Sequence, residues 1–307
     1  MRHLLHNLYF LLVLFSAAAT AQEKFQPISQ EAYQVMTQFC EYDRGIPLNT
    51  HIVETVDMEY CTREKIVFSS VNNERVPGYL AIPKMGNRPY PIVLMQHGFG
   101  HEKESWWNGE TYCNGSILTK DLLESGYAVL MLDAQYFGER MGRNDFEHPR
   151  VFTVEKQWYY RLNSSVVQTV KDYRRAMDYL ATRLEIDTSR IGLTGYSMGG
   201  IQTFILTAID SRIKTSVSVV PLPQGMHGAS SDYYLAVPKH HASRIGNRPF
   251  LLLMGNEDKS YTPEQGQELY ELLNSSQKEI IWYDSGHSLP GEWTREALNW
   301  YKKYLSY

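Results

Sequence analysis

The chain has 307 residues, of which 43% are hydrophobic and 21% are charged. This composition is typical of a globular protein and excludes the collagen-like, coiled-coil and fully disordered classes. The formal net charge is −4, from 30 basic and 34 acidic residues, and the basic residues are scattered, so neither a nucleic acid nor an anionic membrane surface is an expected partner.

Residues 1–21 have the pattern of a secretory signal peptide. Arg2 lies in a short polar start, an apolar run from Leu8 to Ala19 follows, and Ala19-Thr20-Ala21 offers small residues around a cleavage position. The apolar run is shorter than the ~20 residues that a membrane-spanning helix needs, and no other segment approaches that length. We therefore expect a mature chain that begins near Gln22, has no membrane span, and is periplasmic or secreted.

The mature chain is expected to consist of an N-terminal arm, residues 22–62, and one larger domain, residues 63–307. The arm is polar and aromatic without clear periodicity, which favours a segment wrapped on the core. No internal repeat, low-complexity tract or Pro/Gly/Ser linker divides the remainder. The runs Ile66–Phe68 and Tyr79–Ile82 flank Asn72-Asn73, and this arrangement predicts a hairpin of two edge strands.

Six short apolar runs, each long enough for one buried strand, occupy residues 91–96, 127–133, 190–194, 217–220, 250–254 and 279–283. The runs are continuous rather than alternating, which is typical of strands that helices cover on both faces. Helical patterns lie between or after them at residues 164–184, 199–208, 263–274 and 290–305. This order predicts an α/β fold with a mostly parallel central sheet and helices on both faces. Ligands of such sheets bind at the carboxyl ends of the strands.

The sequence contains three cysteines, Cys40, Cys61 and Cys113. An oxidising compartment permits one disulfide, and Cys40 with Cys61 is the favoured pair because both lie in the N-terminal segment; three buried free thiols are the alternative. No Cys/His spacing indicates a zinc site, so no metal is predicted. Three triplets match the glycosylation acceptor pattern, beginning at Asn114, Asn163 and Asn274. They matter only in a eukaryotic source.

A candidate nucleophile follows the predicted strand at 190–194. The segment Gly195-Tyr196-Ser197-Met198-Gly199 has the pattern G-x-S-x-G between a predicted strand and a predicted helix. A serine at such a turn takes strained dihedral angles, and the glycines avoid clashes at the flanking positions. The pattern alone is short, but its strand–turn–helix context predicts Ser197 as a catalytic nucleophile.

A carboxylate and a histidine follow two later strands. Asp258 comes after the run at 250–254 and is preferred to Glu257 because of its Gly-x-x-Asp spacing; a solvated loop charge is the alternative. His287 lies in a glycine-containing loop after the run at 279–283, where it can reach the serine. Serine catalysis needs a histidine base that a carboxylate orients, so Ser197, Asp258 and His287 are predicted as a catalytic triad.

The segment His97-Gly98-Phe99-Gly100 follows the run at 91–96. A glycine-rich turn at a strand end can direct a backbone N–H at a developing oxyanion. The predicted oxyanion donors are the N–H groups of Phe99 and of Met198, and His97 is expected to order the loop rather than to react.

Together these motifs resemble the α/β-hydrolase superfamily, and within it the dienelactone hydrolase, acetyl xylan esterase and prolyl-oligopeptidase-like branch. The resemblance covers roughly residues 65–305 and rests on HGFG at 97–100, DAQYFGER at 133–140, the run at 172–200, GNED at 255–258 and GHS at 286–288. It implies serine hydrolysis through an acyl-enzyme without a metal or organic cofactor. Two departures stand out: dienelactone hydrolases proper use cysteine where this chain has Ser197, and prolyl peptidases carry a propeller that the short arm cannot form.

The function predicted from these features is a secreted serine hydrolase of carboxylic esters, with short acyl and carbohydrate-linked esters as substrates. A serine peptidase of prolyl-oligopeptidase-like type is one alternative. A non-catalytic, hydrolase-like binding protein is another, and it would be expected to lack a triad member, whereas all three are present.

The pocket rim is expected in the long connections at residues 136–163 and 222–247. Three aromatic pairs, Trp106-Trp107, Tyr159-Tyr160 and Tyr233-Tyr234, either form a platform for an aromatic or sugar ester or pack the loops to the core. Glu139-Arg140 is interpreted as a structural ion pair rather than a substrate clamp.

Overall fold

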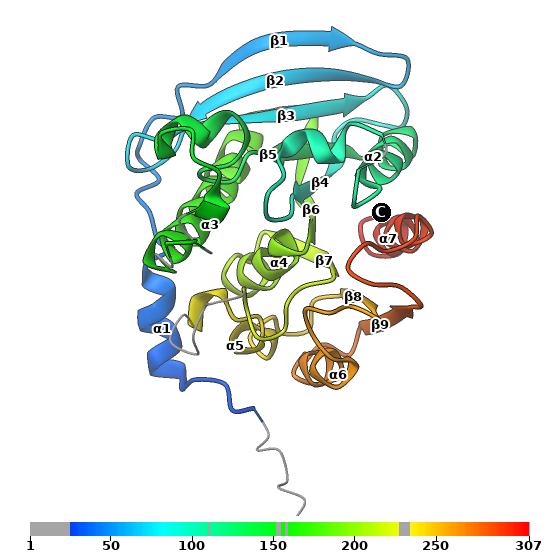
Figure 1. Ribbon diagram of the computed structural model, residues 1–307. Coiled ribbons are helices and arrows are strands. Elements are labelled where there is room, and N and C mark those ends of the chain that lie inside the picture. Colours follow the sequence, from blue (N-terminus) through cyan, green and yellow to red (C-terminus); the bar gives the residue numbers. More distant parts are fainter. Residues whose placement is uncertain (1–24, 110, 152–154, 157–158, 227–233, 307) are drawn as a thin grey trace, which may run out of the picture.

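The computed structural model describes residues 25–306 except 110, 152–154, 157–158 and 227–233. The predicted signal peptide, residues 1–21, therefore lies outside the described residues. The described chain forms a nine-stranded sheet in the order β1-β2-β3-β5-β4-β6-β7-β8-β9 (Figure 1). The strands are His51–Asp57, Cys61–Ser69, Arg75–Pro83, Tyr90–Gln96, Ala128–Leu132, Ile186–Tyr196, Ile213–Val219, Phe250–Gly255 and Lys278–Tyr283, for β1 to β9.

The six strands β4 to β9 run parallel to one another, as their continuous apolar sequences predict. β4 pairs with β5 and β6, and each later strand pairs with the next. Every residue of β4, β5 and β8 is buried, because helices cover both faces of the sheet at these positions. The mostly parallel α/β architecture is therefore confirmed.

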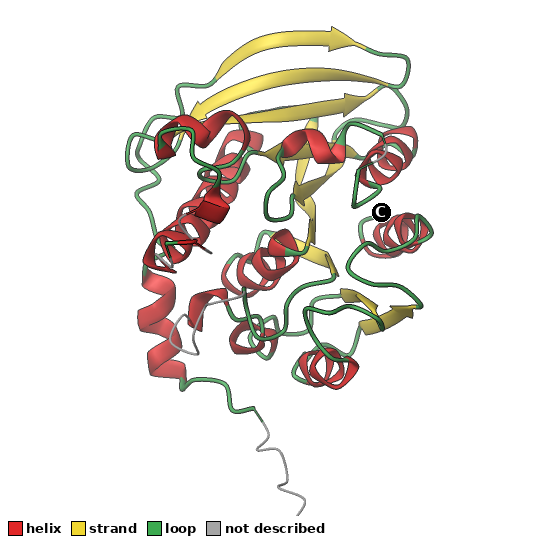
Figure 2. Cartoon of the chain, in the orientation of Figure 1, coloured by secondary structure: helices red, strands yellow, loops and turns green. Residues whose placement is uncertain are grey.

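The first three strands form an antiparallel extension at one side of the sheet, seen at the top of Figure 2. β2 and β3 form the predicted hairpin, and Asn72 and Asn73 both take positive φ angles at its turn, which asparagine tolerates better than most residues. Neither strand is an edge strand as predicted, because β1 pairs with the other side of β2 and β5 pairs with the other side of β3. Within the arm at 22–62, for which no regular element was predicted, the chain thus forms β1 and also the helix α1, Gln30–Gln38.

The helices divide between the two faces of the sheet, and their bounds are α2 Gly115–Glu124, α3 Tyr159–Leu180, α4 Met198–Ile209, α5 Lys239–Ala242, α6 Pro263–Glu271 and α7 Trp293–Tyr304. In Figure 1, α2 and α7 lie on one side of the strands while α3 and α4 lie on the other. Two apolar cores result, one that includes Leu118 of α2 and Trp293 of α7, and one that includes Val170 of α3 and Ile201 of α4. The four predicted helical patterns correspond to α3, α4, α6 and α7, whereas α2 was not predicted.

The predicted Cys40–Cys61 disulfide is wrong. All three cysteines are buried as free thiols. Cys61 belongs to the core that α2 and α7 cover, whereas Cys40 belongs to the core on the opposite face, so the sheet separates the two sulfurs. No helix in the described part of the chain combines the length and the apolar character needed to cross a lipid bilayer.

Candidate active site

The predicted nucleophile lies at a sharp turn between β6 and α4. Ser197 takes φ 56° and ψ −111°, a conformation that costs free energy for any residue with a Cβ atom. Its N–H donates to Val219 O at 2.8 Å, and its carbonyl accepts from Ile201 N–H at 3.0 Å, so strand and helix hold both sides of the turn. Gly195 is required here because a Cβ atom at this position would overlap the backbone of Gly199. The turn thus presents the Ser197 hydroxyl at the carboxyl end of the sheet.

Ser197, His287 and Asp258 form one hydrogen-bonded chain. The Ser197 hydroxyl lies 2.8 Å from His287 Nε2, and His287 Nδ1 lies 2.5 Å from Asp258 Oδ2. Because a carboxylate oxygen only accepts, Nδ1 carries the proton and Nε2 is free to accept the serine proton. Asp258 and His287 follow β8 and β9, two paired parallel strands, and their side chains meet where these strands end. Glu257 is exposed and has no contact with this chain of bonds.

The environment of Asp258 keeps its carboxylate charged. Only 1% of the side chain is exposed. Burial raises the pKa of this carboxyl, but hydrogen bonds from His287 and from the Ser260 amide, at 2.8 Å, outweigh burial and leave the pKa below its ordinary value. A charged Asp258 stabilises the imidazolium that forms when His287 accepts a proton.

The two predicted oxyanion donors are backbone amides of residues that line the cavity at Ser197. The N–H groups of Phe99, after β4, and of Met198, the first residue of α4, have no acceptor among the described residues. His97 orders the loop that carries Phe99: its Nδ1 donates to Gly98 O at 2.9 Å, and its Nε2 accepts from Ala134 N–H at 3.0 Å. His97 is buried, and burial lowers its pKa, so it is a neutral structural group rather than a base.

A cavity of about 340 Å³ opens onto Ser197 and His287. Its walls include residues from both predicted rim connections, such as Leu162 from the first and Leu222 from the second. The other lining residues are Phe99, His101, Tyr112, Arg150, Met198, Met226 and Ser260. The walls are mostly apolar and aromatic, as is usual for a site that binds a small organic molecule.

Comparison with known proteins identifies the chain. The profile of the dienelactone hydrolase family matches residues 76–296. The chain belongs to the dienelactone hydrolase family. The Bacillus subtilis protein YtaP is 28% identical over 245 residues, which are 73% of this chain and 79% of that protein.

Solved structures share the fold of this family member. An acetyl xylan esterase from Paenibacillus sp. has a TM-score of 0.70 at 17% identity, over 92% of this chain and 97% of that chain. Acetyl xylan esterase 1 from Thermoanaerobacterium sp. has a TM-score of 0.67 at 16% identity, over 92% and 96% of the two chains. The fold is therefore that of the α/β-hydrolase superfamily.

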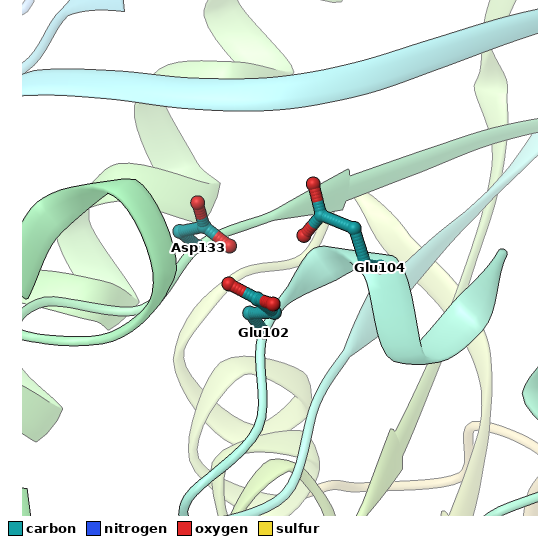
Figure 3. Close-up of side chains that lie close together, drawn as sticks. All are labelled: Glu102, Glu104 and Asp133. Carbon is teal, nitrogen blue, oxygen red and sulfur yellow. The ribbon is translucent and has the colours of Figure 1, made fainter. Parts of the chain in front are cut away.

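A second cavity, of about 320 Å³, adjoins the first at His101 and is lined by Glu102 and Glu104. Figure 3 shows these two carboxylates beside that of Asp133, and one oxygen of each lies within 4.8 Å of the others. The buried Lys103 ammonium offsets part of this negative charge, at 2.8 Å from Asp133 and 3.0 Å from Glu104. Burial lowers the pKa of Lys103, but the attraction to Asp133 outweighs it, so this lysine stays charged. A side chain of the protein thus supplies one positive charge to this cluster.

Trp106 packs in the core, and Glu139 and Arg140 each bind other partners. Trp106 is fully buried against Trp293 in the core, so it packs the fold and forms no platform. Tyr233 lies outside the described residues. Glu139 and Arg140 do not pair with each other in the described chain. Glu139 binds Lys103 and Lys65, whereas Arg140 binds Asp172 at 2.6 Å and Glu74 at 3.0 Å.

One important contact was missed from the sequence. Tyr196 occupies the variable position before the nucleophile, and its hydroxyl donates to His287 O and accepts from Leu289 N–H, both at 2.8 Å. These bonds fix the loop that carries His287. The pattern G-x-S-x-G accepts any residue at this position, so no local signal indicates the role of Tyr196.

Proposed function

We propose that this family member is a secreted serine esterase that cleaves short acyl esters, including acyl groups on carbohydrates, through an acyl-enzyme. One observation carries the proposal: the bonded chain of Asp258, His287 and Ser197 opens onto a cavity whose wall contains two unpartnered amides. Acyl transfer of this kind needs a hydroxyl nucleophile, a histidine base in the correct tautomer, a carboxylate that orients the base, and donors for the oxyanion.

In the acylation step, His287 Nε2 takes the hydroxyl proton while Ser197 Oγ attacks the ester carbonyl carbon. The carbonyl oxygen becomes an oxyanion between the Phe99 and Met198 N–H groups, and each such donor contributes about 10²–10³ in rate. The imidazolium then gives its proton to the alkoxy oxygen. The C–O bond breaks, the alcohol leaves, and the acyl group stays on Ser197.

In the deacylation step, water occupies the place of the alcohol. His287 takes a proton from this water, which attacks the acyl carbon and forms a second oxyanion at the same two amides. Collapse of this intermediate returns the proton to Ser197 Oγ and releases the carboxylic acid. The enzyme ends the cycle in its initial protonation state.

The cavity and the chain organisation favour esters over peptides. A volume of about 340 Å³ suits a small acyl group with part of its alcohol. An amide has a poorer leaving group, so a peptidase must grip its substrate on both sides of the scissile bond. The described residues of the arm form α1 and the edge strand β1, and none of them lines this cavity. The acetyl xylan esterase names of two structural neighbours support an acetylated carbohydrate as substrate.

The nucleophile is tested by the variant Ser197→Ala, with p-nitrophenyl acetate as substrate and a fluorophosphonate as covalent probe. We expect less than a thousandth of the wild-type kcat and no labelling, because triad members act as a unit. Ser211→Ala, at an exposed serine just after α4, is the matched control and should label like the wild type. Retention of more than a tenth of the activity would overturn the assignment of Ser197.

The reaction class is tested by comparing p-nitrophenyl acetate and acetylated xylan with a set of aminoacyl-p-nitroanilides on the purified mature protein. We expect kcat/KM for the acetyl esters to exceed that for the anilides by orders of magnitude. Comparable values would favour the peptidase alternative instead.

Secretion is tested by expressing the full chain in its native host and measuring the N-terminus by mass spectrometry. A mature chain that begins near Gln22 in the periplasmic or extracellular fraction is the expected result. An intact Met1 in the cytoplasm would refute this part of the proposal.

A further inference from the structure

Tyr112 lies at the wall of the catalytic cavity, and two neighbouring aromatic rings pack against its ring. It belongs to the segment between the short helix Lys103–Trp106 and α2. The His101 ring stacks on it, with ring centroids 3.7 Å apart and an interplanar angle of 19°, and Tyr196 meets it edge to face at 5.1 Å. These two contacts leave the ring little freedom, so the position of its hydroxyl is determined by packing.

The hydroxyl of Tyr112 has an unused donor. Its oxygen accepts a hydrogen bond from Gly98 N–H at 2.7 Å. A phenol also carries one O–H proton to donate, and no acceptor for it is present among the described residues. Tyr112 lines the same cavity as Ser197 and His287, so an O–H that donates to no described residue is available to a ligand bound there.

The bond to Gly98 also places this donor beside the predicted oxyanion site. Gly98 directly precedes Phe99, whose unpartnered N–H is one of the two backbone donors. Gly98 and Phe99 are consecutive, and atoms that repeat along the chain are at most about 3.8 Å apart, so with the 2.7 Å bond to Gly98 N the hydroxyl lies no more than about 6.5 Å from Phe99 N. The close approach requires glycine at position 98, because a Cβ atom there would overlap the Tyr112 hydroxyl.

We propose that the Tyr112 hydroxyl is a third donor of the oxyanion hole, which donates a hydrogen bond to the ester carbonyl oxygen as negative charge develops on it. The inference rests on the proposed esterase function and adds a catalytic residue to it. Gly98 N–H, as a donor to the same oxygen, polarises the phenol and makes it a stronger donor to the substrate. Burial raises the pKa of Tyr112 well above its ordinary value, so the donor proton is retained at neutral and mildly alkaline pH.

The first test is Tyr112→Phe, which keeps the ring and removes only the hydroxyl. We expect kcat/KM for p-nitrophenyl acetate to fall about 10²-fold, with the loss in kcat and with KM changed less than threefold, because the bond strengthens only in the transition state. Tyr42→Phe is the matched control: its hydroxyl binds Asp178, away from the cavity, and its loss should leave kcat/KM unchanged.

A purely structural hydroxyl, which only anchors Gly98, could also lower kcat when removed, so a second variant separates the two roles. Replacement of Tyr112 by 3-fluorotyrosine keeps the hydroxyl but makes it a stronger donor and a weaker acceptor. Donation to the substrate predicts that kcat/KM at neutral pH is equal to or higher than that of the wild type. Anchoring of Gly98 alone predicts a lower value.

The results distinguish this inference from the function on which it rests. An active wild type with an unaffected Tyr112→Phe variant would overturn the role of Tyr112 and leave the esterase function intact. A loss confined to KM, or a fluorotyrosine enzyme with less than half of the wild-type kcat/KM, would also overturn it. A wild type that neither hydrolyses esters nor reacts with the fluorophosphonate would overturn both.

Discussion

Replacement of Asp258 by asparagine should disable catalysis by changing the tautomer of His287. The carboxylate accepts on both sides, from His287 Nδ1 at 2.5 Å and from Ser260 N–H at 2.8 Å. An asparagine amide has one acceptor and one donor end. Because Ser260 N–H can only donate, the amide oxygen turns toward it and the NH₂ group faces His287. Nδ1 must then accept, so the proton moves to Nε2, which can no longer take the proton of Ser197.

The size of the loss follows from two contributions. The opposite amide orientation would place two donors against each other, which costs about 1–3 kcal/mol and keeps the inactive tautomer dominant. The variant also lacks the negative charge beside the imidazolium, an attraction of about 4 kcal/mol for charges ~4 Å apart at an effective dielectric constant of ~20. Each factor of ten in rate corresponds to about 1.4 kcal/mol. Because the two contributions overlap and do not add in full, we expect kcat/KM to decrease by about 10³–10⁴.

The assay is the initial rate of p-nitrophenyl acetate hydrolysis, with thermal unfolding measured in parallel. The asparagine side chain has nearly the shape of the aspartate, so the melting temperature should change by only a few degrees. Glu257→Gln changes the charge of the exposed neighbour by the same amount and should leave the rate within a factor of two. A loss of less than tenfold in Asp258→Asn, or a larger loss in Glu257→Gln, would refute the reasoning.

Three further predictions concern the scaffold. Gly195→Ala should abolish hydrolysis and lower the melting temperature by calorimetry, because its Cβ atom overlaps the first turn of α4; a fully active variant would contradict the described turn. Arg140→Leu leaves the buried carboxylate of Asp172 without its counter-charge and Glu74 with only the exposed Arg143, at 3.6 Å, so urea unfolding should show a loss of about 3–5 kcal/mol, and a loss below 1 kcal/mol would argue against it. Burial lowers the pKa of His241 from 6.5 to about 3, so the unfolded chain binds the extra proton first. The neutral, buried His241 therefore stabilises the fold fully above pH 6.5, and the free energy of unfolding falls by about 1.4 kcal/mol per unit of pH from there toward pH 3. Urea unfolding at pH 7 and pH 5 should show a smaller dependence on pH in His241→Gln.

The parallel part of the sheet was predictable because burial on both faces leaves a direct trace in the sequence. Strands such as β4 and β8 are continuous apolar runs, and each is followed at its carboxyl end by glycine and a polar residue. Since these ends lie at one edge of the sheet, the order of motifs was enough to place Ser197 near Asp258 and His287. The order of the three motifs along the chain therefore predicted that these residues lie close together, without any knowledge of tertiary contacts.

The antiparallel extension could not be predicted in the same way. β1 has exposed residues on both faces, so it shows neither a continuous apolar run nor alternation, and it forms by pairing with β2. The two cysteines of the arm illustrate the same limit, because proximity in sequence does not reveal that the sheet passes between them. The hydroxyls of Tyr112 and Tyr196 act through contacts with distant backbone, which no local pattern encodes.

The predicted triad and the walls of the cavity come from different parts of the fold. Ser197, Asp258, His287 and the amide of Phe99 follow β6, β8, β9 and β4, four strands of one hydrogen-bonded sheet, so the backbone pairing of the sheet fixes their separations. The cavity walls instead come from connections between these elements, which include Tyr112, Arg150 and Leu222. Loops tolerate substitution better than a buried parallel sheet does. Changes in acyl or alcohol preference should therefore arise in the loops without displacing the triad, whereas a substitution that shifts β8 against β9 should impair the hydrolysis of every ester alike.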